Sequence, residues 1–97
     1  MSIKKSKQLP SLHIRDLCGN WKSTYRSPPI KIFRENRKYY LMISFRQDRD
    51  TTVEITCRIH RYCTRVYINY FEELDIQYDK ESDQLHLAVE GKYIREQ

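Results

Sequence analysis

The stretch TTVEITCRIH, residues 51–60, alternates between apolar and polar side chains. One parity holds Val53, Ile55, Cys57 and Ile59, and the other holds Glu54, Thr56, Arg58 and His60. A period of two is the repeat of a β-strand, whose successive side chains point to opposite faces. The stretch therefore predicts a strand with one face toward a core and the other toward water.

The same alternation recurs through most of the chain. It predicts further strands over residues 21–25, 30–35, 39–47, 65–71, 74–79 and 84–96, the last of which is bent or divided at Gly91. Short polar turns separate these segments, and short connections join antiparallel neighbours because parallel strands need long crossovers. We predict an all-β fold, a single up-and-down antiparallel meander of seven or eight strands that closes into a small barrel and so removes its edges.

The N-terminal segment differs from the rest of the chain. Residues 1–10 are predicted to be a flexible basic arm that ends at a proline. Ser11 can cap a short helical turn over LHIRDL, residues 12–17, and Gly19 is suited to stop it. Residues 11–97 are predicted to form one β-barrel domain, since 97 residues suffice for one domain only.

Composition limits the class of protein. Hydrophobic residues make up 39% of the chain and eight residues are tyrosines, which is too much apolar and aromatic surface for a disordered chain. The N-terminus lacks the apolar run of a signal peptide, and no segment approaches the roughly 20 apolar residues that span a bilayer. Cys18, Cys57 and Cys63 lack CxxC spacing and are an odd number, which fits free thiols. We expect a cytoplasmic protein.

A second stretch, LCGNWKSTY at residues 17–25, holds the only tryptophan of the chain and one of its two glycines. A helical turn followed by Gly19-x-Trp21 on the first strand, and then by an antiparallel meander, resembles the lipocalin-type (calycin-type) barrels. That resemblance implies that Trp21 closes one end of the barrel and that Arg95, from the last strand, packs across it. An arginine on a tryptophan face gains about 0.5–2 kcal/mol from cation–π attraction.

The chain is much shorter than lipocalins proper and is closer to the small lipocalin-like domains of Bacteroides-type bacteria. As a whole it is also similar to a family of uncharacterised Bacteroides-type proteins of about this length, some of them linked to conjugative elements. That second resemblance implies no activity.

The predicted interior is crowded. Its inward-facing residues are mostly bulky, and an eight-stranded barrel is just wide enough for side chains to fill. We therefore expect a mostly solid core. Any small apolar ligand would bind at the open end of the barrel, where Tyr25 and Tyr93 are the candidate mouth residues.

No sequence pattern indicates catalysis. Cys57, His60 and Cys63 have ligand-type side chains, but Cys57 and His60 point to opposite faces of a strand and no fourth ligand is local. Residues 79–90 space their acids like a calcium loop, but Gln84 stands where such a loop needs glycine. The chain has no glycine-rich phosphate cradle and no nucleophile beside a base. We expect no enzymatic activity, no metal and no cofactor.

The charge is divided between the two halves of the chain. Residues 1–49 hold 12 Lys/Arg against 3 Asp/Glu, a net charge of +9, while residues 50–97 hold 6 against 10, a net charge of −4. Phosphates attract basic side chains, and single-stranded bases stack on aromatic ones. The candidate nucleic-acid surface comprises Lys4, Lys5, Lys7, Lys22, Arg26, Lys31, Arg34, Arg37, Lys38 and Arg46.

Outward-facing aromatic side chains offer a different kind of contact. Phe33, Tyr40, Tyr67 and Phe71 are the candidate surface for a protein partner or a second copy of the chain. Our leading interpretation is a non-catalytic binding module that acts through protein–protein interaction or self-association. The alternatives are a nucleic-acid-binding accessory protein and a module that binds a small apolar ligand.

Overall fold

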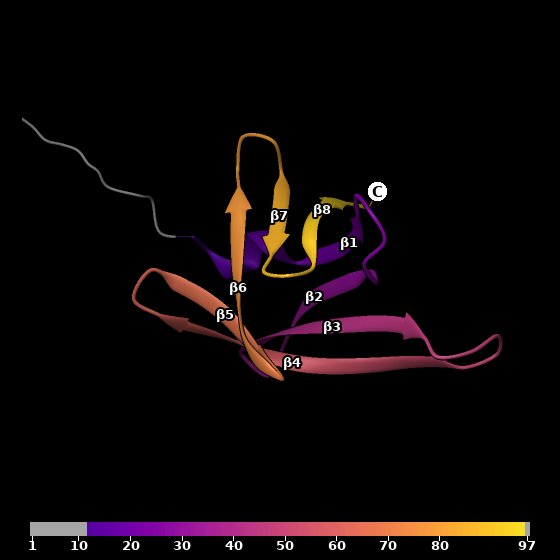
Figure 1. Cartoon of the computed structure of the whole chain (residues 1–97). Helices are drawn as coiled ribbons and strands as arrows, with labels where there is room; N and C mark the ends of the chain where they lie inside the picture. Colours follow the sequence, from indigo (N-terminus) through magenta and orange to yellow (C-terminus); the bar gives the residue numbers. More distant parts are fainter. Residues whose placement is uncertain (1–11, 97) are drawn as a thin grey trace, which may run out of the picture.

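The structure, a computed structural model, describes residues 12–96 as eight antiparallel strands that close into a barrel in the order of the sequence (Figure 1). A short 3-10 helix, η2, precedes them. The elements are η2 (Ile14–Leu17), β1 (Gly19–Ser23), β2 (Ile30–Glu35), β3 (Lys38–Arg46), β4 (Thr52–Tyr62), β5 (Arg65–Tyr70), β6 (Glu72–Asp79), β7 (Gln84–Leu87) and β8 (Gly91–Arg95). The predicted all-β meander and its closure are confirmed, with eight strands, the larger of the two predicted numbers.

Two long strands turn the corners of the barrel. The first part of β4, Thr52–Arg58, pairs with β3, and its last part, Ile59–Tyr62, pairs with β5. Likewise β6 pairs first with β5 and then with β7. The β3–β4 hairpin reaches beyond the rest of the barrel (Figure 1), and Phe45 and Val53, paired near its tip, are only half-buried.

The core draws on every strand. Among the described residues, the 15 buried hydrophobic ones are Leu17, Trp21, Ile30, Ile32, Leu41, Ile43, Cys57, Ile59, Val66, Ile68, Leu74, Ile76, Leu85, Leu87 and Tyr93. They follow the period-two alternation, since Leu41 and Ile43 of β3 face Cys57 and Ile55 of β4 across the sheet. The alternation therefore predicted which face of each strand is inside.

The prediction of inward parity is wrong at two places where a strand has already ended. Tyr25 is 83% exposed because β1 ends at Ser23 and the chain then bends, with the Tyr25 amide hydrogen-bonded to the Ser23 hydroxyl. Val89 is 78% exposed and has φ 61, because it lies in the tight turn between β7 and β8. Residues 84–96, predicted as a strand bent or divided at Gly91, are thus two strands, paired at Leu87 and Gly91.

Two turns also lie elsewhere than predicted. The helical turn ends at Leu17 with Cys18 as its cap, so Gly19 does not stop the helix but begins β1. The break between β5 and β6 falls at Phe71, with φ 66, and not at the two following glutamates.

Within residues 12–96, no helix is long and apolar enough to cross a membrane. The predicted arm, residues 1–10, lies outside the described residues.

Candidate functional site

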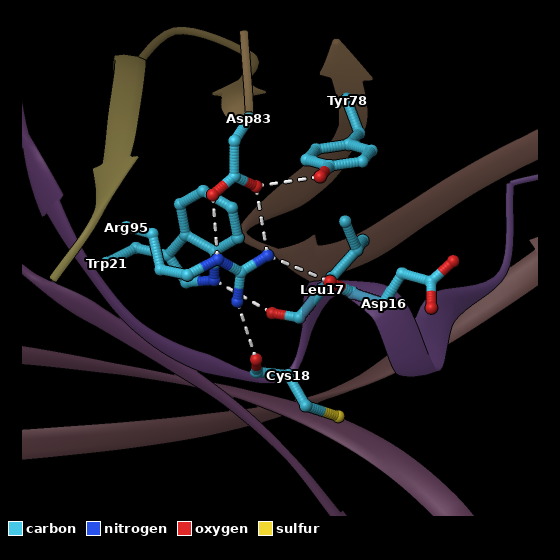
Figure 2. Close-up of polar contacts among 7 residues, drawn as sticks. All are labelled: Asp16, Leu17, Cys18, Trp21, Tyr78, Asp83 and Arg95. Atoms are coloured by element: carbon cyan, nitrogen blue, oxygen red, sulfur yellow. Dashed lines mark hydrogen bonds and ion pairs between the residues drawn. The ribbon is translucent and has the colours of Figure 1, made fainter. Parts of the chain in front are cut away.

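Trp21 and Arg95 are register partners on the first and last strands, at the seam where the barrel closes (Figure 2). The Trp21 side chain is fully buried, and its indole N–H donates to the Leu17 carbonyl at 2.8 Å. The Arg95 guanidinium carbon lies 4.3 Å from the Trp21 ring centroid, within cation–π range. The tryptophan thus ties η2 to β1, and the arginine covers it from β8.

The guanidinium of Arg95 is held from several sides (Figure 2). Its Nε and Nη2 donate to the Asp83 carboxylate at 2.9 and 3.1 Å. The two remaining contacts go to the main chain around η2, where Nη2 donates to the Asp16 carbonyl at 2.9 Å and Nη1 to the Cys18 carbonyl at 2.8 Å. The guanidinium is thus bonded to the β6–β7 turn and to the main chain around η2.

Asp83 joins the cluster from the β6–β7 turn. Besides Arg95, its carboxylate accepts a hydrogen bond of 2.7 Å from the Tyr78 hydroxyl. These donors, Arg95 first and Tyr78 second, lower the pKa of Asp83. The sequence predicted only that Asp83 lies in an acidic turn and that Tyr78 faces inward from its strand. No spacing in the sequence indicates that Asp83 and Tyr78 lie beside Arg95.

The candidate ligand mouth does not form. Tyr93 is fully buried, and its hydroxyl donates to the Pro28 carbonyl at 2.8 Å, whereas Tyr25 points into solvent. Burial raises the pKa of Tyr93 to about 12, which keeps its hydroxyl neutral. The two tyrosines therefore do not line a shared opening.

The outer surface of β2, β3 and β4 carries a run of aromatic and basic side chains. Phe33 and Tyr40 are register partners, and their rings stack at 5.6 Å between centroids with an interplanar angle of 26°. The Lys31 ammonium lies 5.9 Å from the Phe33 ring centroid. Arg58 pairs with Tyr40 from the other side and is exposed.

This run continues along β4 onto β5. His60 lies two residues beyond Arg58 on the same face and pairs with Tyr67, and their rings stack at 5.4 Å. The Arg65 guanidinium carbon lies 4.4 Å from the Tyr67 ring centroid. We call this surface the aromatic–basic strip, defined by Lys31, Phe33, Tyr40, Arg58, His60 and Tyr67. His60, considered in the sequence only as a metal ligand, is its least expected member.

The four residues of the candidate surface for a protein partner do not form one patch. Phe33 and Tyr40 lie together, and Tyr67 belongs to the far end of the strip. Phe71 is 96% exposed in the β5–β6 turn and packs edge-on against Tyr70, with ring centroids 4.7 Å apart.

The candidate nucleic-acid residues are also divided. Lys31 and Lys38 lie on the outer face of the barrel, whereas Arg34 pairs with Tyr39 on the opposite face. The remaining described ones, Lys22, Arg26, Arg37 and Arg46, are exposed, and Lys4, Lys5 and Lys7 lie outside the described residues. Among residues 12–96, the salt bridges involve only Arg65 and Arg95, so the basic side chains of the strip are not neutralised by a described carboxylate.

The three thiols differ in their burial. Cys57 is buried, Cys18 is half-buried and Cys63 is exposed in the β4–β5 turn, and all three are free. Burial raises the pKa of Cys57 and of Cys18, which keeps both as neutral thiols. In the part of the chain that the structure describes, no group of three or more His, Cys, Asp or Glu residues could hold a metal ion.

Comparison with known proteins places the chain in a family without an assigned activity. No curated protein and no solved structure matches it. The resemblance to uncharacterised Bacteroides-type proteins is confirmed, because a family model matches residues 5–95. The chain belongs to the family described as "Domain of unknown function, B. Theta Gene description (DUF3876)".

Proposed function

We propose that this chain is a non-catalytic binding module that binds single-stranded nucleic acid on the aromatic–basic strip. One observation carries the proposal: the stacked pairs Phe33–Tyr40 and His60–Tyr67 flank an exposed Arg58 that has no carboxylate partner among residues 12–96. Single-stranded nucleic acid binds where two features meet, cations without a carboxylate partner and exposed aromatic rings.

The strip suits the chemistry of an unpaired strand. Bases stack on aromatic faces whatever their sequence, and each such contact contributes about 1–3 kcal/mol by alanine substitution. Lys31, near the Phe33 ring, and Arg58, the register partner of Tyr40, supply positive charge for the phosphates. A duplex hides its base faces, so the strip favours a single strand over a double one.

A titration of a labelled single-stranded oligonucleotide, followed by fluorescence anisotropy at low salt, tests the proposal. We expect binding that Tyr40→Ala and Arg58→Gln each weaken about tenfold or more. Lys80→Gln is the matched control for charge, because Lys80 is an exposed cation in the acidic β6–β7 turn. Absence of binding at low salt, or an equal loss in Lys80→Gln, would contradict the proposal.

Phe71 favours a second candidate function, the docking of a protein partner or of a second copy of this chain. An almost fully exposed phenylalanine at φ 66 costs conformational free energy without contributing to the core. Size-exclusion chromatography with light scattering should show a concentration-dependent dimer that Phe71→Asn abolishes. A monomer at every concentration would exclude self-association.

At the level of fold, we propose kinship with the lipocalin-type barrels. Support comes from the eight-stranded up-and-down order and from the packing of Arg95 on Trp21 at the end where η2 lies. Fold likeness alone carries no ligand or activity.

A further inference from the structure

A second candidate site lies between η2 and the neighbouring ends of β3 and β4. It is a surface hollow of about 320 Å³ lined by His13, Ile14, Arg15, Tyr39 and Arg61. Two guanidinium groups and an imidazole thus surround the hollow, and no carboxylate is among its lining residues. Such a lining is complementary to an anion.

A third arginine strengthens the positive charge of this region. The Arg34 guanidinium carbon lies 5.7 Å from the ring centroid of Tyr39, which forms one wall of the hollow. Arg34 also pairs with Tyr39 across β2 and β3, so the sheet register fixes its place. Like Arg58 of the strip, Arg15, Arg34 and Arg61 make no salt bridge within residues 12–96.

One of the lining arginines, Arg61, also makes a hydrogen bond to the main chain beside the hollow. Arg61 donates a hydrogen bond from Nη2 to the main-chain carbonyl of Leu12, the residue before His13. This contact connects the end of β4 to the segment that leads into η2. The end of β4 and the segment before η2 are therefore attached to one another, and one of the two lining guanidinium groups is held in place before any ligand arrives, which lowers the entropic cost of binding.

We propose that this hollow binds a phosphomonoester. Guanidinium groups form paired hydrogen bonds to phosphate oxygens, and a terminal phosphate offers three such oxygens and close to two negative charges. A volume of about 320 Å³ accommodates a phosphate with a small organic group attached. The Tyr39 ring and Ile14 supply apolar surface for that group.

The inference goes beyond the proposed function. Tyr39 and Tyr40 are neighbours on β3 and point to opposite sides of the sheet, so the hollow and the aromatic–basic strip lie on different surfaces. A phosphomonoester reaches the hollow either as a free small molecule or as the 5′-terminal phosphate of a nucleic acid strand. The shared chemistry is the terminal phosphate, and the source is a matter for experiment.

Isothermal titration calorimetry with adenosine 5′-monophosphate, adenosine and inorganic phosphate as probes tests the site. We expect the monophosphate to bind with a Kd of about 1 mM or tighter and adenosine not to bind. Arg15→Gln and Arg61→Gln should each weaken the monophosphate about tenfold. The matched control is Arg37→Gln, which removes the same charge from the exposed β2–β3 turn.

Arg61→Gln also removes the contact with Leu12, so its melting temperature is measured first. If that variant unfolds, Arg15→Gln decides, because Arg15 donates no side-chain hydrogen bond within residues 12–96. No binding of monophosphate or phosphate at about 10 mM would overturn the proposal, and so would equal weakening in Arg37→Gln.

Two further arms separate the sources and the two sites. A 5′-phosphorylated oligonucleotide that binds more tightly than its 5′-hydroxyl form, with the difference lost in Arg15→Gln, assigns the hollow to a strand end. Equal binding of the two oligonucleotides assigns it to small phosphomonoesters. Arg58→Gln should leave monophosphate binding unchanged, so that failure of the strip and failure of the hollow are distinguishable.

Discussion

The Arg95 guanidinium lies 4.3 Å from the centre of the Trp21 ring, and the two residues face one another across the seam between β8 and β1. The barrel closes at this seam, because the first and the last strand pair there. Asp83 and the main chain around η2 hold the guanidinium in place. Arg95 thus joins the last strand, β8, to the β6–β7 turn and to η2 beside the seam.

Truncation of the tryptophan should destabilise the barrel strongly. Trp21→Ala removes the largest fully buried side chain and should lower the free energy of unfolding by about 3–5 kcal/mol. Arg95→Ala should cost less, about 1–3 kcal/mol, because the arginine is partly exposed. Urea denaturation measures both, and a larger loss for Arg95→Ala than for Trp21→Ala would contradict this ranking.

Gly19 should not tolerate a side chain. Its φ is +137°, and a Cβ at this position would lie 3.0 Å from Nη1 of Arg95. Gly19→Ala should therefore cost about 1–3 kcal/mol, through backbone strain and through displacement of the contact between Arg95 and the Cys18 carbonyl. In an Arg95→Ala background the same change should cost less, since the clash is gone. Equal costs in both backgrounds would show that strain alone is responsible.

The Asp83 carboxylate should make stability depend on pH on the acid side. Hydrogen bonds from Arg95, and then from Tyr78, lower its pKa in the folded state below the ordinary value of 3.8. As pH falls, the unfolded chain therefore takes up a proton at Asp83 before the folded chain does. The contribution of Asp83 to the free energy of unfolding is present above the unfolded-state pKa and is lost as pH falls through the folded-state pKa. Wild type and Asp83→Asn should differ in urea midpoint at neutral pH and converge as pH falls through the lowered folded-state pKa of Asp83.

The control for that experiment is Glu81→Gln, which removes a charge from the same turn without removing a partner of Arg95. Its pH profile should parallel that of the wild type. If Asp83→Asn also runs parallel, the contact with Arg95 does not contribute to stability.

Tyr93 should make stability depend on pH on the alkaline side. Burial raises its pKa to about 12 in the folded state, above the ordinary value of 10.0. As pH rises, the unfolded chain loses the Tyr93 hydroxyl proton before the folded chain does. The contribution of Tyr93 to the free energy of unfolding is therefore complete below the unfolded-state pKa and is lost as pH rises from 10 toward 12. Between these two pH values, the melting temperature should fall more steeply with pH for wild type than for Tyr93→Phe. Coincident profiles would mean that Tyr93 ionises without unfolding the barrel.

Strand parity predicted the barrel because one face of each strand is buried, and a period of two records that burial directly. It failed for Tyr25 and Val89 because parity has no meaning after the last hydrogen-bonded residue of a strand. It also located Phe33 and Tyr40 on the outside but could not show that they stack, since stacking depends on cross-strand register. The hollow could not be predicted at all, because Arg15 and Arg61 are far apart in the sequence and line one hollow only in the folded barrel.

The proposed role of the aromatic–basic strip is tested most directly by amide chemical-shift mapping during titration with a single-stranded oligonucleotide. Our account predicts shifts concentrated at Lys31–Phe33, Tyr40–Met42 and Arg58–His60, weakening steeply as salt is added. The acidic turn at Asp79–Asp83 should stay unperturbed. Shifts spread evenly over all exposed basic residues, or no shifts at low salt, would contradict it.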